Sequence, residues 1–558
     1  MNTKSQALID LIRQSVIGEG VAITTAFGKK PLVYADYTAS GRALSFIEDI
    51  IQKQVLPFYA NTHTETSYTG AQSTALREGA RNQIRQAVNA GKDDQVIFCG
   101  SGATAAIHKL IDILNLRLPA DLNAQYQLEQ QIPEAERPVV FIGPYEHHSN
   151  ELPWRESIAT VVSIPLNSKG LIDLLELENQ LEHYRDRRLK IGSFSAASNV
   201  TGVKTDVDTL ARLLHNKGAL VFLDYAAAAP YVGIDVQGEI NDQGDNSKDA
   251  VFISPHKFIG GPGTPGVLVV KKHVLKNSVP AVPGGGTVVY VTPEDHRYID
   301  APERSEEGGT PAIVESIRAG LVFKLQQDVG CEEIEARESD FVARAKARWD
   351  LHDNIEVLGN PDAPCLSITS LRIKHLGKDL HYGFIVALLN DLFGIQSRGG
   401  CSCAGPYGHS LLGMDMDYSK ALEAELLKGQ MVLRPGWVRL NFNYFIDEDS
   451  FEYLVNAISL LAESAWRLLP FYHFDQNSGV WRYQNFKGGV GTVLADIDFL
   501  QREDCTSPTS CKFSFSECLA LAAEELNKNR CDEVRSRLDL PEKSDQLRWF
   551  VTPQEIKL

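Results

Sequence analysis

Short apolar runs alternate with amphipathic segments through the first 330 residues of the chain. The runs have the length, the β-branched residues and the flanking breakers of buried strands, and the segments between them have helical periodicity. The predicted strands are Val33–Tyr34, Val96–Cys99, Pro138–Gly143, Thr160–Ile164, a run that starts at Leu189, a run that ends on Asp224, Val251–Ile253 and Val267–Val270. This alternation predicts an α/β fold with a mostly parallel sheet covered by helices.

The pattern changes beyond about residue 330. A helix over Glu332–Trp349 precedes short strands near Ile355–Leu358, Leu366–Leu371 and Trp437–Phe442, which is typical of a smaller α+β domain. The remainder contains a Trp/Tyr-rich strand pair and a helix over Phe515–Asn527. We therefore expect an N-terminal helical segment (1–30), a large domain (31–330), a small α+β domain (331–469) and a C-terminal extension without an assigned role (470–558).

Composition narrows the class of protein. The formal net charge of -17 lacks the basic footprint of a protein that binds nucleic acid or anionic lipid. No apolar run approaches the roughly 20 residues of a membrane span, and the first 18 residues predict an amphipathic surface helix rather than a signal peptide. The nine cysteines form neither a disulfide framework nor paired CxxC zinc ligands. We expect a cytoplasmic protein without a bound metal.

Lys257 lies in a loop rich in Gly and Pro between two of the predicted strands. An ammonium group between buried strands must be paired or lose its proton. One interpretation is a strand-edge lysine that extends to solvent. The other is an amine nucleophile that forms a Schiff base with an aldehyde. The other residues at the strand ends distinguish the two interpretations.

Five polar residues follow predicted strands at their carboxyl ends, where ligands bind in sheets of this kind. They are Thr104, His147, Asn199, Asp224 and Lys257. The turn Gly100–Thr104 joins a strand to a helix, and free amides and the helix dipole make such a turn an anion site. It lacks the third glycine of a dinucleotide motif and the lysine of a P-loop. By itself, a plain strand-to-helix turn would look the same.

From about Pro31 to Asn443 the chain resembles the class V aminotransferase superfamily, whose members are fold type I pyridoxal-phosphate (PLP) enzymes. Within that superfamily it resembles the cysteine desulfurase and selenocysteine lyase group. The motifs that carry the resemblance are, in chain order, GSGAT, EHHSN, DYAAAAP, SPHK, RSEEGGTP, SRGGCSCAGPYG and RPGWVRLNFNYF. The resemblance implies a large PLP-binding domain, a smaller α+β domain and a homodimer.

The resemblance also implies roles for the cofactor-binding residues. Lys257 would be the Schiff-base lysine, Asp224 would pair with the pyridinium nitrogen, and His147 would lie flat against the ring. The phosphate would bind Gly102, Ala103, Thr104, Ser254 and His256, and Thr310 would reach the cofactor phosphate of the other subunit. Asn199 would contact the cofactor and the substrate.

Two further residues are implied on the substrate side. Arg439 would bind the substrate α-carboxylate in bidentate fashion, although an arginine in a surface ion pair is the alternative. Cys403, followed by Ala-Gly-Pro, would be the thiolate nucleophile, with Arg398 and the cofactor lowering its pKa, although a small buried thiol is the alternative. In an extended loop Cys401 and Cys403 would face the same way, so Cys401 is a candidate resolving thiol.

The resemblance implies a cysteine desulfurase that converts L-cysteine to L-alanine with a persulfide on Cys403, or a related selenocysteine lyase. Its partners would be a small amino-acid substrate and a sulfur-acceptor protein. Desulfurases of this group carry Gln three residues after the pyridine Asp, but here the residue is Ala227, which leaves the reaction open. One alternative is a β- or γ-lyase or an aminotransferase in which Cys403 is not catalytic. Another is a non-catalytic sulfur carrier or scaffold.

Overall fold

The protein was analysed as a computed structural model, which describes residues 3–62, 64–484, 486, 488, 491, 493–497 and 514–557. The described chain forms two compact units. Unit 1 comprises residues 1–16, 38–337 and 360–366, and unit 2 comprises residues 17–37, 338–359 and 367–558. The units interleave along the chain, and the described part of the extension belongs to unit 2. The domain limits predicted at residues 30, 330 and 469 remain predictions.

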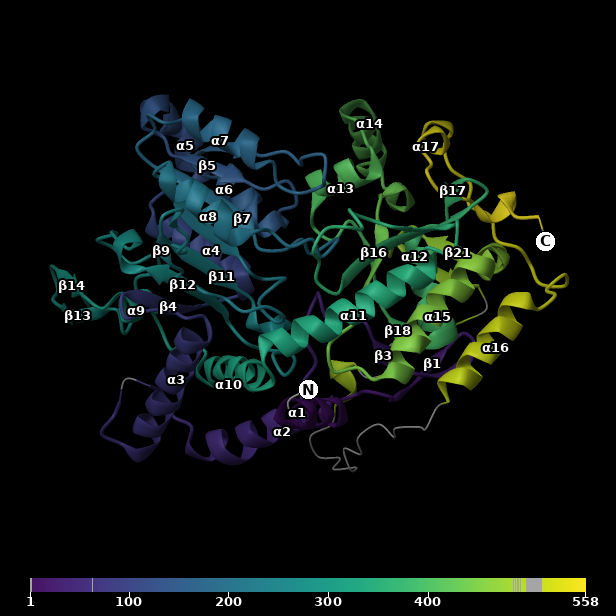
Figure 1. The fold of residues 1–558 in the computed structure, drawn as a ribbon, viewed down its shortest axis with the longest axis horizontal. Coiled ribbons are helices and arrows are strands. Elements are labelled where there is room, and N and C mark those ends of the chain that lie inside the picture. Colours follow the sequence, from purple (N-terminus) through teal and green to yellow (C-terminus); the bar gives the residue numbers. More distant parts are fainter. Residues whose placement is uncertain are drawn as a thin grey trace. The chain divides into compact units, whose positions relative to one another are not determined.

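Unit 1 is built on a seven-stranded sheet in the order β4-β12-β11-β8-β7-β5-β6 (Figure 1). Its strands are β4 (Asp94–Cys99), β5 (Val139–Ile142), β6 (Thr160–Ser163), β7 (Lys190–Ser195), β8 (Leu220–Asp224), β11 (Ala250–Ile253) and β12 (Gly266–Lys271). β12 is antiparallel to both of its neighbours, and the other pairs are parallel. The mostly parallel sheet predicted from the sequence is therefore confirmed.

Helices cover both faces of this sheet. On one face α4 (Gly102–Ile113) packs Ile107 and Leu110 against inward-facing strand residues such as Ile191 and Phe252. The next residue along β7, Gly192, points to the opposite face, because side chains alternate along a strand. A Cβ at Gly192 would lie 2.4 Å from Leu214 of α8 (Val207–Asn216), so α8 covers that face closely.

The remaining elements of unit 1 surround the sheet. The helices are α1 (Thr3–Ser15), α2 (Ser45–Ile50), α3 (Tyr68–Ala87), α5 (Ala120–Tyr126), α6 (Leu152–Arg155), α7 (Leu174–His183), α9 (Pro302–Ser305) and α10 (Ile313–Val329), and α11 (Cys331–Trp349) continues from unit 1 into unit 2. The hairpins are β9 (Ile240–Asn241) with β10 (Gly244–Asp245) and β13 (Val288–Val291) with β14 (His296–Tyr298). The predicted amphipathic N-terminal helix corresponds to α1, which buries Ile9 and Ile12.

The edge strand β4 is covered by two glutamates instead of another strand. Glu303 Oε1 accepts the Val96 amide (2.7 Å) and Glu307 Oε1 accepts the Phe98 amide (2.7 Å). Glu307 also pairs with the buried guanidinium groups of Arg77 (2.5 Å) and Arg81 (2.9 Å). The carboxylates therefore satisfy backbone donors that an open sheet edge would expose.

Unit 2 contains a second, antiparallel sheet. Its strands are β15 (Ile355–Val357), β16 (Ile368–His375), β20 (Trp437–Asn441) and β19 (Arg398–Gly400), with β17 (Lys378–Asp379) paired to β16. Its helices are α12 (Tyr382–Phe393), α13 (Gly405–Leu412), α14 (Met416–Leu426) and α15 (Glu448–Ser464). A hairpin, β1 (Ala22–Thr25) with β2 (Gly28–Pro31), and a parallel pair, β3 (Val33–Tyr34) with β18 (Ile395–Gln396), also belong to this unit.

The C-terminal extension packs onto α12 as part of unit 2. It contributes the strand pair β21 (Tyr472–Asp475) and β22 (Val480–Tyr483), α16 (Phe515–Asn527) and α17 (Glu542–Gln546). Tyr472 donates its hydroxyl to Asp391 of α12 (2.7 Å), and Trp481 is almost fully buried. The predicted strand pair and the predicted helix over Phe515–Asn527 are both confirmed. Residues 498–513 lie outside the described residues.

Candidate active site

The five predicted strand-end residues all lie at the ends of strands of the large sheet. One is the last residue of its strand, three lie in the segments that follow strands, and one lies in the helix that follows a strand. Asp224 is the last residue of β8, and Lys257 follows β11 in a short 3₁₀ turn. His147 and Asn199 follow β5 and β7, and Thr104 lies in the first turn of α4 after β4. All of these strands run in the same direction, so the residues share the carboxyl edge of one sheet.

The predicted anion site is the start of α4. This helix begins at Gly102, within the predicted turn Gly100–Thr104, because Gly102 adopts a left-handed φ of 58° that lets the chain turn directly into the helix. The Ala103 amide donates to Ser254 Oγ (2.8 Å). A Cβ at Gly102 would lie 2.8 Å from that same oxygen, so the two segments approach too closely for a side chain.

Lys257 lies close enough to Asp224 for its charge to act on the carboxylate. Burial raises the pKa of Asp224, and the hydrogen bond from the Ala226 amide (2.8 Å) and the charge of Lys257 oppose that rise. Burial, with the Lys257 charge, lowers the pKa of His256 to about 4. Lys257 itself is partly buried. A lysine, a buried carboxylate and a neutral imidazole therefore occupy one end of β8 and β11.

His147 is oriented by the segment that follows it. Its Nδ1 accepts the Ser149 amide (3.1 Å), so a neutral ring carries its proton on Nε2. Ser149 Oγ lies 3.0 Å from this Nδ1 and 2.6 Å from Thr104 Oγ1. The serine thus links the predicted ring-stacking histidine to the predicted phosphate-binding helix start.

Glu146 is a buried acid beneath this edge that sequence analysis missed. Its carboxylate accepts hydrogen bonds from the Ser195 amide (2.9 Å), the Ser195 hydroxyl (2.6 Å) and Asn150 Nδ2 (2.7 Å). Burial raises its pKa to about 7, and the nearby charge of Asp224 contributes in the same direction. Its position directly before His147 in the EHHSN motif was the available signal.

Asn199 and Thr310 lie in two separate loops of unit 1. Asn199 is 7% exposed in the loop after β7. Thr310 lies in the segment after α9, where Asn61 Nδ2 donates to its hydroxyl (3.2 Å), and it lines a cavity of about 600 Å³ together with Gly100 and Ser101. The roles assigned to both residues remain predictions.

The predicted substrate arginine, Arg439, lies on β20 of unit 2 with its side chain 4% exposed. Asp36 Oδ1 accepts from Arg439 Nη2 (3.1 Å), and Asp36 Oδ2 accepts from Arg398 Nε (3.0 Å). Sequence patterns do not reveal these contacts of Asp36, because its partners are 403 and 362 residues away.

Cys403 occupies the tip of a tight turn in unit 2. The Ala404 amide donates to the Cys401 carbonyl (3.2 Å), and the two central residues, Ser402 and Cys403, have left-handed φ angles of 54° and 56°. The loop is therefore not extended at this point, because left-handed residues reverse the chain, and the condition under which both cysteines would face the same way is not met. Cys403 is exposed, whereas Cys401 is partly buried.

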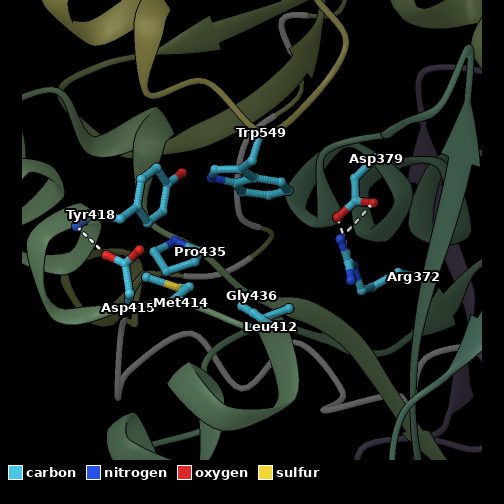
Figure 2. A pocket seen from close by; sticks show the side chains of 10 residues that line it. Arg372, Asp379, Leu412, Met414, Asp415, Tyr418, Pro435, Gly436 and Trp549 are labelled. Atoms are coloured by element: carbon cyan, nitrogen blue, oxygen red, sulfur yellow. Dashed lines mark hydrogen bonds and ion pairs between the residues drawn. The ribbon is translucent and has the colours of Figure 1, made fainter.

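A separate cavity of about 330 Å³ in unit 2 is lined in part by the segment from the end of α13 to the first turn of α14 (Figure 2). The rings of Tyr418 and Trp549 contribute to its walls, together with the ion pair between Arg372 and Asp379. The polar ends of these side chains already have partners: Tyr418 donates to the Leu547 carbonyl, and Trp549 donates to the Leu433 carbonyl. The polar ends of both rings are thus already engaged within the protein.

Within the described ranges, no three His, Cys, Asp or Glu side chains are arranged to hold a metal ion. None of the helices in the described part of the chain is long and apolar enough to cross a membrane.

Comparison with known proteins was made at the level of family, sequence and structure. The family model "Aminotransferase class-V" matches residues 33–422. A probable cysteine desulfurase of Halalkalibacterium halodurans is 29% identical over 380 residues, which cover 67% of this chain and 85% of the relative. A probable cysteine desulfurase of Streptomyces coelicolor is 27% identical over 377 residues, which cover 67% and 84%.

Two solved structures share the fold. The apo structure of a cysteine desulfurase from Thermococcus onnurineus superposes with a TM-score of 0.62 at 21% identity and covers 77% of this chain and 95% of that one. A cysteine desulfurase of Escherichia coli gives a TM-score of 0.59 at 23% identity, with coverage of 77% and 94%. The expected fold type I architecture is confirmed. The matched family region ends before β20 and before the C-terminal extension.

Proposed function

The chain belongs to the aminotransferase class-V family, and from this premise we propose that it is a PLP-dependent cysteine desulfurase. It converts L-cysteine to L-alanine and retains the sulfur as a persulfide on Cys403. The observation that favours this reaction over a lyase or an aminotransferase is the exposed thiol of Cys403 at the tip of the turn formed by residues 401–404. A thiol that receives sulfur from a bound amino acid must be accessible, and this turn presents it.

The residues of unit 1 fit PLP. The start of α4 offers backbone amides to a phosphate, and Gly102 leaves no side chain between that helix and Ser254. Asp224 is a buried carboxylate whose pKa is raised by burial, and a cationic ring nitrogen would supply the compensating charge. Lys257 supplies the amine that holds the cofactor covalently. When bound, PLP supplies an aldehyde for amines and a ring that withdraws electrons from the amino acid.

Side chains of the protein would have separate roles in the reaction. Lys257 Nζ would carry the proton to and from the substrate Cα. His147 would lie against the cofactor ring, and because its Nδ1 accepts the Ser149 amide, a neutral ring keeps its proton on Nε2. Arg439 would orient the substrate α-carboxylate, and Asn199 would contact the cofactor and the substrate. Cys403 attacks as the thiolate: the sulfur–sulfur bond forms as the substrate Cβ–S bond breaks. The electron pair stays on Cβ, which is protonated to give alanine.

Assembly and location complete the proposal. We propose a homodimer in which Thr310 completes the phosphate site of the partner's cofactor, and a cytoplasmic acceptor protein that takes the persulfide sulfur. The seven described cysteines are free thiols, which agrees with a reducing compartment.

A product assay tests the reaction. The purified yellow protein is incubated with L-cysteine, L-selenocysteine or L-alanine in the presence of dithiothreitol, which reduces the Cys403 persulfide and releases its outer sulfur as sulfide. Sulfide or selenide, alanine, pyruvate and keto acids are measured. We expect alanine and sulfide in equal amounts. Cys403→Ser should abolish sulfide release but leave the visible absorption of the cofactor intact. The matched variant Cys401→Ser should reduce sulfide release much less. Pyruvate with ammonia, or near-full sulfide release by Cys403→Ser, would favour the lyase or aminotransferase and reject the proposal.

A further inference from the structure

One carboxylate in unit 2 holds two arginines that come from neighbouring strands. Asp36 Oδ1 accepts from Arg439 Nη2 (3.1 Å), and Asp36 Oδ2 accepts from Arg398 Nε (3.0 Å). The exposed fractions of the three side chains are 4% for Arg439, 13% for Asp36 and 52% for Arg398. Asp36 therefore supplies a negative charge to an arginine that is almost fully buried, where an uncompensated charge is costly.

The two arginines occupy opposed positions in the small sheet. β19 pairs with β20 in antiparallel register, and Arg398 is the Cα partner of Arg439. Like charges directly opposite each other on two strands destabilise the pairing. Asp36 lies between them and converts the repulsion into two ion pairs. The same contact therefore determines both the orientation of Arg439 and the attachment of β19.

The backbone around Asp36 is fixed by the strands that it serves. The Ala35 amide donates to the Gln396 carbonyl (2.9 Å), and the Asn441 amide on β20 donates to the Ala35 carbonyl (3.0 Å). The Tyr37 amide donates to Asn441 Oδ1 (3.2 Å). Residues on both sides of Asp36 are thus tied to β20 or to the chain that leads into β19, so its carboxylate has a defined direction.

β19 is also the strand that leads into the cysteine turn. It ends at Gly400, and the turn that carries Cys403 starts at Cys401. Gly400 faces Gly436 so closely that a Cβ on Gly436 would lie 2.6 Å from the Gly400 backbone. Because this part of β19 has no side chain to anchor it, Arg398 is the residue through which the strand is held to Asp36.

We propose that Asp36 is a positioning residue that couples the carboxylate-binding guanidinium of Arg439 to the strand carrying the cysteine turn. The inference rests on the proposed function, in which Arg439 binds the substrate carboxylate and Cys403 receives the sulfur. Through Arg439, Asp36 directs the guanidinium towards the substrate carboxylate. Through Arg398, it holds β19 and hence the start of the turn.

The first experiment measures carboxylate recognition. L-Alanine and ethylamine differ only by the α-carboxylate, and the change in visible absorption of the loaded protein gives a dissociation constant for each. The wild type binds L-alanine more tightly. In Asp36→Ala this preference falls about tenfold, with ethylamine unchanged, because Arg439 loses its orientation. Asp36→Asn has a side chain of the same size with one acceptor oxygen, so its preference for L-alanine should lie between those of the wild type and Asp36→Ala.

A matched control separates positioning from general loss of an ion pair. Asp379 is as buried as Arg439 and pairs with Arg372 of the same sheet, at 2.7 and 3.0 Å. Asp379→Asn should leave the preference for L-alanine over ethylamine unchanged. Arg398→Gln should also leave it unchanged, because the Asp36–Arg439 contact is retained.

The second experiment needs no cofactor. N-ethylmaleimide labelling of the cofactor-free protein, resolved by mass spectrometry, gives separate rates for Cys401 and Cys403. Asp36→Ala and Arg398→Gln should each raise the Cys401 rate severalfold, because β19 loosens, and Asp379→Asn should not. If Asp36→Ala folds and changes neither the preference nor the labelling, the proposal is rejected. If the wild type releases no sulfide but both effects occur, the desulfurase assignment fails while the role of Asp36 stands.

Discussion

The imidazole of His381 stacks on the indole of Trp549, with ring centroids 5.3 Å apart and planes inclined by 24°. His381 caps α12, and Trp549 belongs to the C-terminal extension. The His381 Nδ1 accepts from the Gly383 amide (3.0 Å) and from Trp481 Nε1 (3.1 Å), and Nε2 donates to the Val432 carbonyl (3.1 Å). Burial lowers the pKa of His381 to about 3, so the ring stays neutral. The extension therefore completes the core of unit 2.

Trp481→Ala tests the contribution of this contact. The indole is 2% exposed and donates to His381, so its removal leaves a cavity and costs about 3–5 kcal/mol of unfolding free energy. The neighbouring variant Val480→Ala, at a side chain that is 41% exposed, should cost less than about 1 kcal/mol. Urea unfolding measures both. Equal small losses would mean that the extension is not part of the core.

Glu307→Gln tests the cover of the sheet edge. Two nearly buried guanidinium groups, those of Arg77 and Arg81, would lose their charge partner, which costs about 3–5 kcal/mol. Glu78 also pairs with Arg81 but is 50% exposed, so Glu78→Gln should cost less than about 1 kcal/mol. Thermal and urea unfolding compare the two variants, and a loss below 1 kcal/mol in Glu307→Gln would contradict the expectation.

Glu146 gives a pH dependence of stability. Burial raises its pKa from 4.5 to about 7. Between these values the unfolded chain has released the proton that the folded protein still binds, so the unfolding free energy falls as pH rises. Glu146→Gln lacks this titration. The unfolding free energy of Glu146→Gln minus that of the wild type should therefore rise by about 2–3 kcal/mol from pH 5 to pH 8. A difference between the two proteins that does not vary with pH would reject the assignment.

His215 gives a second pH dependence of stability, from its ion pair with Asp249, the residue directly before β11. Burial acts to lower the pKa of His215, but its hydrogen bond to Asp249 (3.0 Å) and the charge of Asp249 hold the pKa above 6.5. The stabilisation is complete below the unfolded pKa and is lost as pH rises through the folded pKa. His215→Gln should therefore destabilise by about 1–2 kcal/mol more at pH 6 than at pH 9.

Subunit mixing tests the proposed dimer. Lys257→Ala and Thr310→Ala should each be inactive alone, and Lys257→Ala should lose the visible absorption band after dialysis. A mixed dimer contains one site free of both changes if Thr310 serves the partner's cofactor. Mixing should then restore up to about a quarter of wild-type activity, since half of the dimers are mixed. No recovery despite demonstrated subunit exchange would place Thr310 in its own subunit's site.

Sequence patterns were sufficient where a single run of residues determines the structure. The strands that end at Asp224 and before Lys257 are short, apolar and bounded by breakers, so they were predictable together with the edge on which their polar residues meet. α16 was predicted with the observed limits, because its periodicity starts after Ser514, a residue suited to cap it.

Features that depend on distant partners were not predictable. β19 contains Arg398, Gly399 and Gly400, none of which favours a strand, and it forms because β20 pairs with it. The partners of Asp36 lie more than 360 residues away. The cysteine turn was missed because Ser402 and Cys403 occur in a left-handed conformation that neither residue prefers.

The left-handed turn also constrains natural variation around Cys403. Two consecutive non-glycine residues at positive φ are costly, each by about 1 kcal/mol, and the cost rises for side chains branched at Cβ. Relatives that keep the turn should therefore carry Gly, Asn, Asp or Ser at the position of Ser402, and exclude Val, Ile and Thr. In an alignment of desulfurases, this turn would therefore be visible as a restricted choice of residue directly before the cysteine that we propose as the sulfur acceptor.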